Sequence, residues 1–225
     1  MLFSTLDLIA LSWFLIAWAA YAATLAWTEK RKRGLNSEMN RYRDVWMRQM
    51  LAREMRMVDA QIVAALQNGT AFFASTSLIA AGGALTLLRS TQEILDVVAA
   101  LPFGVSTTAV QWEAKTIGLA FIFVYAFFKF GWSYRLYNYV AIMVGATPPA
   151  SQKEQPEAVA HAARVGRLCE VAGRHFNRGQ RAFFFALGYL GWFISPWLLM
   201  ATSVAVAVIL WRRQFASDSQ RIFAD

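Results

Sequence analysis

Four polar residues in a mostly apolar chain have the chemistry of an anion-binding site. Asn68 and Thr70 lie near the start of one apolar block, and Lys129 and Arg135 lie toward the end of another. An amide, a hydroxyl and two cations supply hydrogen-bond donors and positive charge, which suit a carboxylate, a phosphate or a lipid headgroup. The alternative is that the cations only extend to a membrane surface, without a specific ligand. Both interpretations depend on where membrane helices place these residues.

The composition is that of a membrane protein. Of the 225 residues, 57% are hydrophobic and only 16% are charged, and the mean hydropathy is +0.37. The apolar residues form blocks long enough to cross a hydrocarbon core of about 30 Å, which takes roughly 20 residues of helix. We therefore predict an all-α polytopic membrane protein, a single integral membrane domain, with four transmembrane helices at about residues 2–27, 62–88, 116–143 and 183–211.

Two segments between these blocks have the periodicity of amphipathic helices. In residues 36–61 and 156–182, apolar side chains recur every three or four positions, and no breaker separates the first segment from the second block. We predict that long cytoplasmic helices there extend the second and fourth membrane helices. Residues 91–101 begin with capping-box spacing and predict a short helix on the outer interface. Pro196 falls inside the fourth block, where it predicts a kink.

The distribution of lysine and arginine predicts an orientation. Nine of these residues lie in 28–61 and six in 144–182, against two in 89–115. Because cytoplasmic loops retain lysine and arginine, both long basic segments should be cytoplasmic and both termini extracytoplasmic. This assignment is opposed by three arginines of the C-terminal tail: Arg212, Arg213 and Arg221.

The predicted spans also give the depth of the four polar residues. At about 1.5 Å per residue, Lys129 lies about 20 Å below Thr116, and Arg135 lies about 29 Å below it. Arg135 thus reaches the inner boundary easily, whereas Lys129 is deeper than its side chain comfortably covers. Asn68 and Thr70 should lie at a similar depth on the second span. We therefore predict a cationic site for an anion or lipid headgroup near the cytoplasmic leaflet, with simple extension of Lys129 to the interface as the alternative.

Two further sets of residues are candidates for contacts. Four arginines lie on the polar face of residues 156–182 and are predicted to meet anionic headgroups or a protein partner: Arg167, Arg174, Arg178 and Arg181. The alternative is charge that only contacts water and attracts lipid weakly. Small residues let membrane helices approach closely, so we predict helix packing through Ser75, Gly82 and Gly83, within the chain or in a homo-oligomer.

The residue pattern does not favour enzyme chemistry. Cys169 is the single cysteine, and His161 and His175 lie about 21 Å apart on one helix, so we predict no metal and no cofactor. No serine–histidine–aspartate set is visible, and Asp7 is the only acid within an apolar block. Basic residues alternate with acidic ones, which disfavours nucleic acid as a partner. We expect no catalytic residues and no enzyme activity.

Several motifs together resemble one family. They lie in residues 33–36, 39–43, 53–54, 58–61, 68–76 and 128–139. The chain resembles the family called domain of unknown function 599, which is found in bacterial and plant membrane proteins. The resemblance implies an integral protein with four membrane helices, here expected in a bacterial inner membrane. It implies no catalytic residues.

Three functions from different classes follow from these patterns. The favoured one is a non-catalytic accessory protein that binds lipid or an anion at the cytoplasmic leaflet, with anionic membrane lipids or a larger membrane complex as partners. The second is an oligomeric channel or transporter for a small anion, since four helices rarely enclose a pore alone. The third is a membrane enzyme that acts on lipid headgroups.

Overall fold

The computed structural model describes residues 3–31, 34–99, 107–216 and 222, and these residues contain seven α-helices, two short 3₁₀ helices and no strand. The all-α prediction is therefore confirmed. In chain order the elements are α1 (Thr5–Lys30), α2 (Leu35–Leu51), α3 (Met57–Thr86), α4 (Thr91–Ala99), α5 (Ala109–Gly145), η1 (Ala150–Gln152), α6 (Pro156–Tyr189), η2 (Leu190–Phe193) and α7 (Pro196–Phe215). Four of them, α1, α3, α5 and α7, are long and apolar enough to cross a membrane. Parts of the predictions fall outside the described residues, at positions 2, 32–33, 100–101 and 221.

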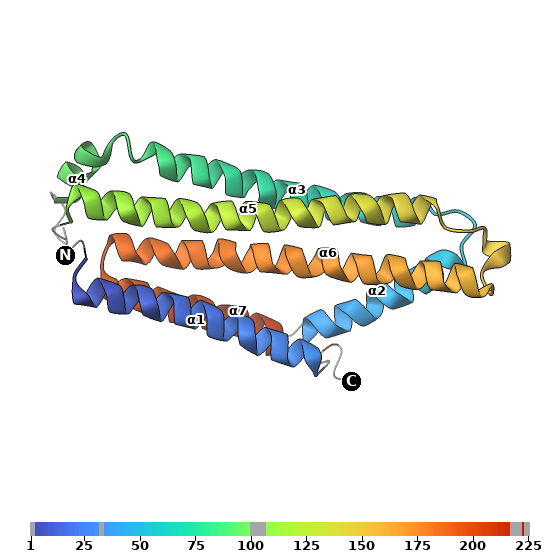
Figure 1. Cartoon of the computed structure of the whole chain (residues 1–225). Helices are drawn as coiled ribbons and strands as arrows, with labels where there is room; N and C mark the ends of the chain where they lie inside the picture. The colour runs from blue at the N-terminus through green and yellow to red at the C-terminus, as the bar shows by residue number, and fades with distance from the viewer. Residues whose placement is uncertain (1–2, 32–33, 100–106, 217–221, 223–225) are drawn as a thin grey trace.

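The helices form an elongated bundle in which α6 occupies the centre (Figure 1). α3 and α5 run side by side along one flank, and α1 and α7 pair along the other. α2 leaves the end of α1 and packs against the first half of α6. α4 lies at the opposite end, beside the start of α5. We call these two ends of the bundle the α2 end and the α4 end.

Aromatic side chains fill the core between α1, α3, α5, α6 and α7. Phe14, Phe130 and Phe185 are each at most 1% exposed. Phe185 stacks on Trp18 with 5.3 Å between ring centroids, and Phe130 stacks on Phe73 with 5.4 Å. Such ring pairs contribute about 0.5–1.5 kcal/mol each beyond the area they bury. This core joins both flanks of the bundle to α6.

A second apolar core lies toward the α2 end, between α2, α3, α5 and α6. Its members include five fully buried side chains: Met50, Val63, Val140, Val165 and Cys169. α5 has 37 residues, which span about 55 Å and exceed a hydrocarbon core of about 30 Å. The bundle is therefore longer than a membrane is thick, and α1 and α7 accompany only part of it (Figure 1).

The prediction that residues 36–61 continue into the second span as one helix is wrong. A turn at residues 52–56 separates α2 from α3. The carboxylate of Asp59 is completely buried, and it accepts hydrogen bonds from Trp46 Nε1 at 2.7 Å and Arg53 Nη1 at 2.6 Å. The chain thus turns at residues that include neither proline nor glycine, because tertiary hydrogen bonds hold it there.

The predicted fourth span at residues 183–211 is also wrong, because the chain reverses within it. α6 ends at Tyr189, η2 follows, and α7 runs back beside α1 (Figure 1). Ser195 has an extended backbone, and its hydroxyl accepts a hydrogen bond from Leu198 N at 3.1 Å. Proline suits the first turn of a helix, where no N–H is needed. Pro196 therefore begins a new helix in place of the predicted kink.

The reversal changes where the end of α7 lies. α6 becomes a central element of the bundle although it is not one of the four apolar spans. The last turn of α7 comes close to the connection between α1 and α2, with Phe215 beside Gly34. The start of α1 and the end of α7 thus lie at opposite ends of the paired helices (Figure 1). This path does not agree with the prediction that both termini lie on one side of the membrane.

The small residues of α3 divide between two faces. The face that packs within the chain carries Ser77, Ala81 and Ala84, which are buried. The three residues predicted to pack, Ser75, Gly82 and Gly83, are exposed, and a Cβ atom added at either glycine would meet nothing within 4 Å. Packing within the chain therefore uses other residues, and self-association through the exposed face stays a prediction.

The close approach of α6 to α5 predicts a difference between two glycine substitutions. A Cβ atom at Gly179 would lie 2.8 Å from the ring of the buried Phe130. We expect Gly179→Ala to lower the free energy of unfolding by about 1–3 kcal/mol, because the ring cannot move without disturbing the aromatic core. Gly83→Ala is the matched control, since its Cβ has open space and alanine favours a helix by about 1 kcal/mol. Thermal unfolding in detergent measures both, and equal melting temperatures would contradict this packing.

Candidate functional site

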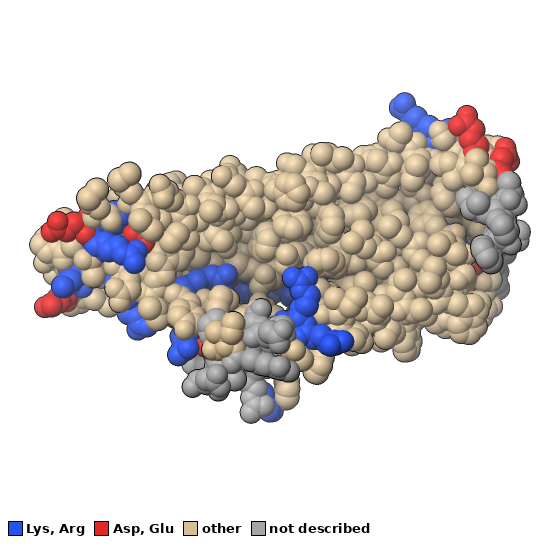
Figure 2. Space-filling view, turned by 180° about the vertical axis from the view of Figure 1, so that it is seen from behind, with Lys and Arg blue, Asp and Glu red and all other residues tan. Residues whose placement is uncertain are grey.

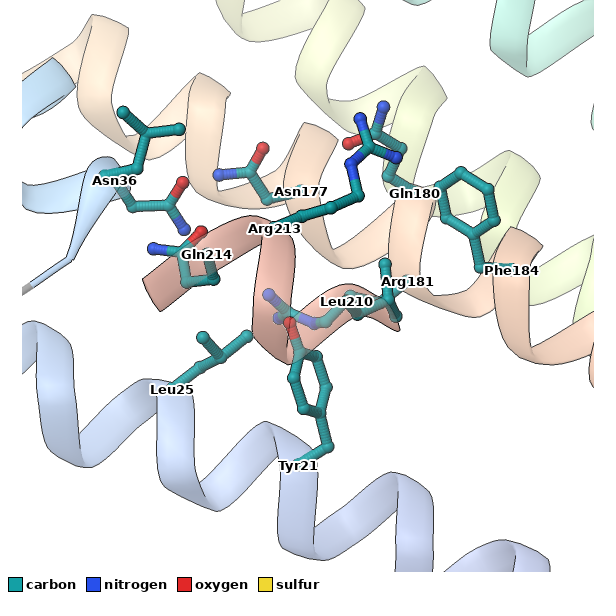
Figure 3. A pocket seen from close by; sticks show the side chains of 11 residues that line it. Tyr21, Leu25, Asn36, Asn177, Gln180, Arg181, Phe184, Leu210, Arg213 and Gln214 are labelled. Carbon is teal, nitrogen blue, oxygen red and sulfur yellow. The ribbon is translucent and has the colours of Figure 1, made fainter. Parts of the chain in front are cut away.

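A polar cavity lies where α1, α2, α6 and α7 meet (Figure 3). Its volume is about 180 Å³. The residues that line it come from all four helices: Tyr21, Leu25, Leu35, Asn36, Asn177, Gln180, Arg181, Phe184, Leu210, Arg213 and Gln214. We call it the Arg181–Arg213 cavity. Its lining combines two cations with four side-chain amides and contains no acid.

Helical spacing places these donors on facing surfaces. On α6, Asn177, Arg181 and Phe184 follow at intervals of four and three residues, which aligns them on one face. On α7, Leu210 and Arg213 are three residues apart and share a face in the same way. The reversal after η2 is what brings this face of α7 back beside α6. A straight helix through that region would carry Arg213 away from Arg181.

The turn between α1 and α2 shapes the mouth of the cavity. Gly34 has a φ of +94°, a backbone conformation that residues with a side chain rarely adopt. A Cβ atom there would also lie 2.9 Å from the ring of Phe215. The turn places Leu35 and Asn36, the next two residues, in the cavity lining. Glycine therefore serves both the turn and the close approach of α7.

Neither arginine of the cavity has a carboxylate partner among the residues that the structure describes. Within the part of the chain that the structure describes, neither Arg181 nor Arg213 forms an ion pair or a hydrogen bond. The guanidinium carbon of Arg213 lies 5.9 Å from the ring centroid of Phe184. Figure 3 shows the hydroxyl of Tyr21 directed toward Arg181, and Glu29 acts on Arg181 electrostatically from outside the cavity. The cavity thus has an excess of positive charge that would attract an anion.

The cavity lies near one boundary of the apolar spans. Counted from Asp7 on α1, Tyr21 is about 21 Å along the helix and Glu29 about 33 Å. Counted from Pro196 on α7, Arg213 is about 26 Å along. In a hydrocarbon core of about 30 Å that begins near Asp7, the cavity falls at the level where the opposite headgroups begin.

One protein-family profile matches most of the chain. The profile of the family described as "Protein of unknown function, DUF599" matches residues 9–219. The chain belongs to the DUF599 family. The resemblance seen in the sequence is thereby confirmed, and the matched region includes every residue that lines the cavity. The searches of curated proteins and of solved structures found no match.

The polar residues predicted on the second span do not line this cavity. In this DUF599 protein, Asn68 is exposed on α3. Thr70 is buried and donates to the carbonyl oxygen of Leu66 at 2.7 Å, a bond within its own helix. The neighbouring Gln67 donates to Asn138 on α5, so the polar contact between α3 and α5 uses other residues than those predicted.

The two cations predicted on the third span also lie apart from the cavity. Lys129 Nζ is 5.0 Å from the ring centroid of Tyr125, and Arg135 Nε donates to Tyr139 Oη at 2.7 Å. Within the described residues, no hydrogen bond or ion pair joins Lys129 or Arg135 to the two predicted residues of α3. None of the four residues lines the Arg181–Arg213 cavity, and an anion site shared by them stays a prediction.

The four arginines predicted to share a contact face have different surroundings. Arg174 forms a 3.5 Å ion pair with Glu170, while Arg167 and Arg178 are exposed. Arg181 alone among them lines the Arg181–Arg213 cavity. Contact of the exposed pair with lipid headgroups or a partner stays a prediction.

Arg213 is the candidate residue that the sequence analysis missed. The predicted span through Pro196 placed it on the side of the membrane opposite the cavity. Two signals for the correct path were present. Ser195-Pro196 has the pattern of an N-cap followed by proline at the first helical position. The tail arginines also lie on the same side of the membrane as the other basic segments only if the chain reverses.

The histidines and the cysteine do not form a metal centre. Among the described residues, no group of three or more His, Cys, Asp or Glu side chains is arranged to hold a metal ion. His161 Nε2 lies 2.9 Å from the carbonyl oxygen of Met143, and His175 packs edge-on to Trp132. Cys169 is completely buried, and burial raises the pKa of its thiol.

A buried polar cluster joins three elements at the α4 end of the bundle. Asp7 Oδ1 accepts a hydrogen bond from Trp192 Nε1 at 2.8 Å, and Ser4 Oγ donates to Asp7 Oδ2 at 2.6 Å. Lys115 Nζ donates to the carbonyl oxygen of Trp192 at 2.9 Å and lies 4.0 Å from Asp7 Oδ1. These groups satisfy one another, so the cluster joins α1, α5 and η2 and stabilises the fold.

The contact between Asp7 and Lys115 predicts that substitutions of these two residues have non-additive effects on the free energy of unfolding. We expect Asp7→Asn to lower the free energy of unfolding by about 3–5 kcal/mol, because it leaves the buried charge of Lys115 uncompensated. In the Asp7→Asn variant, Lys115→Met should lower the free energy of unfolding by less than it does in the unaltered protein, because both charges are then gone. Asp96→Asn, at an exposed position of α4, is the control. Unfolding in detergent is measured for the unaltered protein, the two single variants, the double variant and the control, and strictly additive effects would show that the two charges do not interact.

Proposed function

We propose that this DUF599 protein is a non-catalytic integral membrane protein that binds an anionic lipid headgroup in the Arg181–Arg213 cavity. One observation supports this above all. Two guanidinium groups line one cavity near the ends of the apolar spans α1 and α7, and neither has a carboxylate partner among the described residues. Near a membrane boundary such charges are poorly compensated by water, so an anion that neutralises them would be stabilising.

The chemistry of the lining suits a phosphate group. A guanidinium presents its N–H donors in a planar fork that matches two phosphate oxygens. The amides of Asn36, Asn177 and Gln180 can donate to further oxygens, and Tyr21 adds a hydroxyl. The apolar side chains of Leu25 and Leu210 in the same lining suit the part of a lipid where the headgroup meets its acyl chains.

We propose that the α2 end faces the cytoplasm of a bacterial inner membrane. The basic segments 28–61 and 144–182 both belong to this end or lead into it, and they carry most of the lysine and arginine between the apolar blocks. With the reversal after η2, Arg212 and Arg213 join them on the same side. The positive-inside rule then favours an extracytoplasmic start of α1 and a cytoplasmic end of α7.

Lipid binding is favoured over the two other functions. The fully buried rings of Phe14, Phe130 and Phe185 fill the core between the helices, which disfavours a pore within one chain. The cavity lining contains no acid, histidine, cysteine or serine, the groups that most often act as bases or nucleophiles. An accessory role, in which bound lipid anchors the protein or a partner, needs neither a pore nor a nucleophile.

Removal of either cavity arginine should weaken lipid binding. We expect Arg181→Gln and Arg213→Gln each to lower the affinity for phosphatidylglycerol by about tenfold or more, because each removes a charge-assisted hydrogen bond worth about 1.5–3 kcal/mol. Arg135→Gln, exposed on α5 away from the cavity, is the control. Native mass spectrometry of the protein titrated with phosphatidylglycerol or with zwitterionic phosphatidylcholine measures this. Equal binding by all four proteins would rule out the cavity as the lipid site.

The proposed orientation predicts opposite labelling of two introduced cysteines. We expect Gln92→Cys, exposed on α4, to react with a membrane-impermeant maleimide added outside intact spheroplasts. Ala216→Cys, exposed just after α7, should react only after the membrane is opened. The native Cys169 is fully buried and serves as an unreactive background. Labelling of both positions from outside would contradict the path of α7 across the membrane.

A further inference from the structure

A second cavity adjoins the Arg181–Arg213 cavity on the side of α1 and α6. Its volume is about 140 Å³. Arg174, Arg178 and Arg181 of α6 line it together with Glu29 of α1. We call it the Arg178 cavity. A water molecule takes up about 30 Å³ of the liquid, so each of the two cavities has room for several waters or for one phosphate group.

The two cavities share part of their walls. Leu25, Asn177 and Arg181 line both of them. Arg181 therefore stands between the cavities and can donate N–H groups to either side. Figure 2 shows lysine and arginine atoms on both sides of a hollow in the flank of the bundle. The two cavities thus form one extended cationic site with Arg181 at its middle.

The charge of this extended site exceeds what one phosphodiester group, with its single negative charge, would neutralise. Its cations are Arg174, Arg178, Arg181 and Arg213, and among the described residues its only lining acid is Glu29. Glu170 forms an ion pair with Arg174 at 3.5 Å from just outside the lining. Four cations against these two acids leave a net charge of +2.

We infer that the site takes a lipid whose headgroup carries two phosphate groups, one in each cavity, with Arg181 between them. The inference rests on the proposed function and specifies its ligand class. Two phosphodiesters carry two negative charges and so match the net charge of the site. Joining them in one molecule makes the second contact intramolecular, which raises the affinity without any further contact.

Cardiolipin, with two phosphates on one glycerol, is the probe, and phosphatidylglycerol at equal phosphate concentration is the reference. The full-length protein in neutral detergent is titrated with each, and binding is followed by native mass spectrometry. We expect cardiolipin to bind about tenfold or more tightly than phosphatidylglycerol. Arg178→Gln should abolish this preference while leaving phosphatidylglycerol bound, because Arg178 lines only the second cavity. Arg135→Gln should keep the preference.

The outcomes separate the inference from the function on which it rests. Equal affinity for the two lipids, or a preference that survives Arg178→Gln, would overturn the two-phosphate ligand and leave a single-phosphate site. Absence of binding by either lipid, or binding that Arg181→Gln does not affect, would overturn the proposed function as well. Arg178 is exposed, so its substitution leaves the apolar cores intact. A melting temperature equal to that of the unaltered protein verifies that the variant is folded.

Discussion

The reversal between α6 and α7 depends on satisfying the backbone carbonyls that the end of a helix leaves free. In an apolar surrounding such carbonyls need partners, because no water is there to supply hydrogen bonds. Thr202 Oγ1 donates to the carbonyl oxygen of Gly188 at 2.7 Å, and Lys115 Nζ donates to that of Trp192 at 2.9 Å. Asp7 in turn accepts from the Trp192 indole and balances the lysine charge. These bonds let the chain end one helix and begin another among the spans.

The contribution of α7 to the cavity follows from this reversal. It returns α7 beside α1, and it brings Arg213 to the level of Arg181. It also makes α6 the central helix, which aromatic rings contact from both flanks and which α2 and α5 approach closely at Gly173 and Gly179. A central helix can carry arginines near its middle, because neighbouring helices cover much of its surface and the charged groups reach a cavity at the boundary.

The position of the cavity near the membrane boundary lets an apolar bundle carry two arginine side chains. Arg181 lies within α6, yet arginine side chains lean toward the start of their helix, which here is the α2 end. The guanidinium can therefore reach the headgroup region although its Cα lies deeper. Arg213 reaches the same region from the last turn of α7, where cations also favour the helix C-terminus. Two helices of opposite direction thus supply cations to one level of the membrane.

The helical class, the apolar blocks and several helix ends could be predicted from the sequence alone. Local composition and capping decide these features: α4 begins at Thr91, as predicted, whereas the capping box of Thr108 starts α5 at Ala109, seven residues before the predicted span at 116. The direction of the chain after Ser195 was decided only by the tertiary structure. Ser-Pro is compatible with both a kinked helix and a new one, and distant partners such as Lys115 select the second.

The same division separates the predicted site from the observed one. The sequence predicted an anion site around Lys129 and Arg135, and it gave Arg181 only as one of four arginines on the polar face of residues 156–182. It could not show which side chains share a cavity, because that depends on how helices are rotated and paired. Lys129 faces Tyr125, and Thr70 bonds to its own helix, whereas Arg213 meets Arg181 only after the reversal. Periodicity determines which face of a helix is polar, and only packing between helices determines what that face meets.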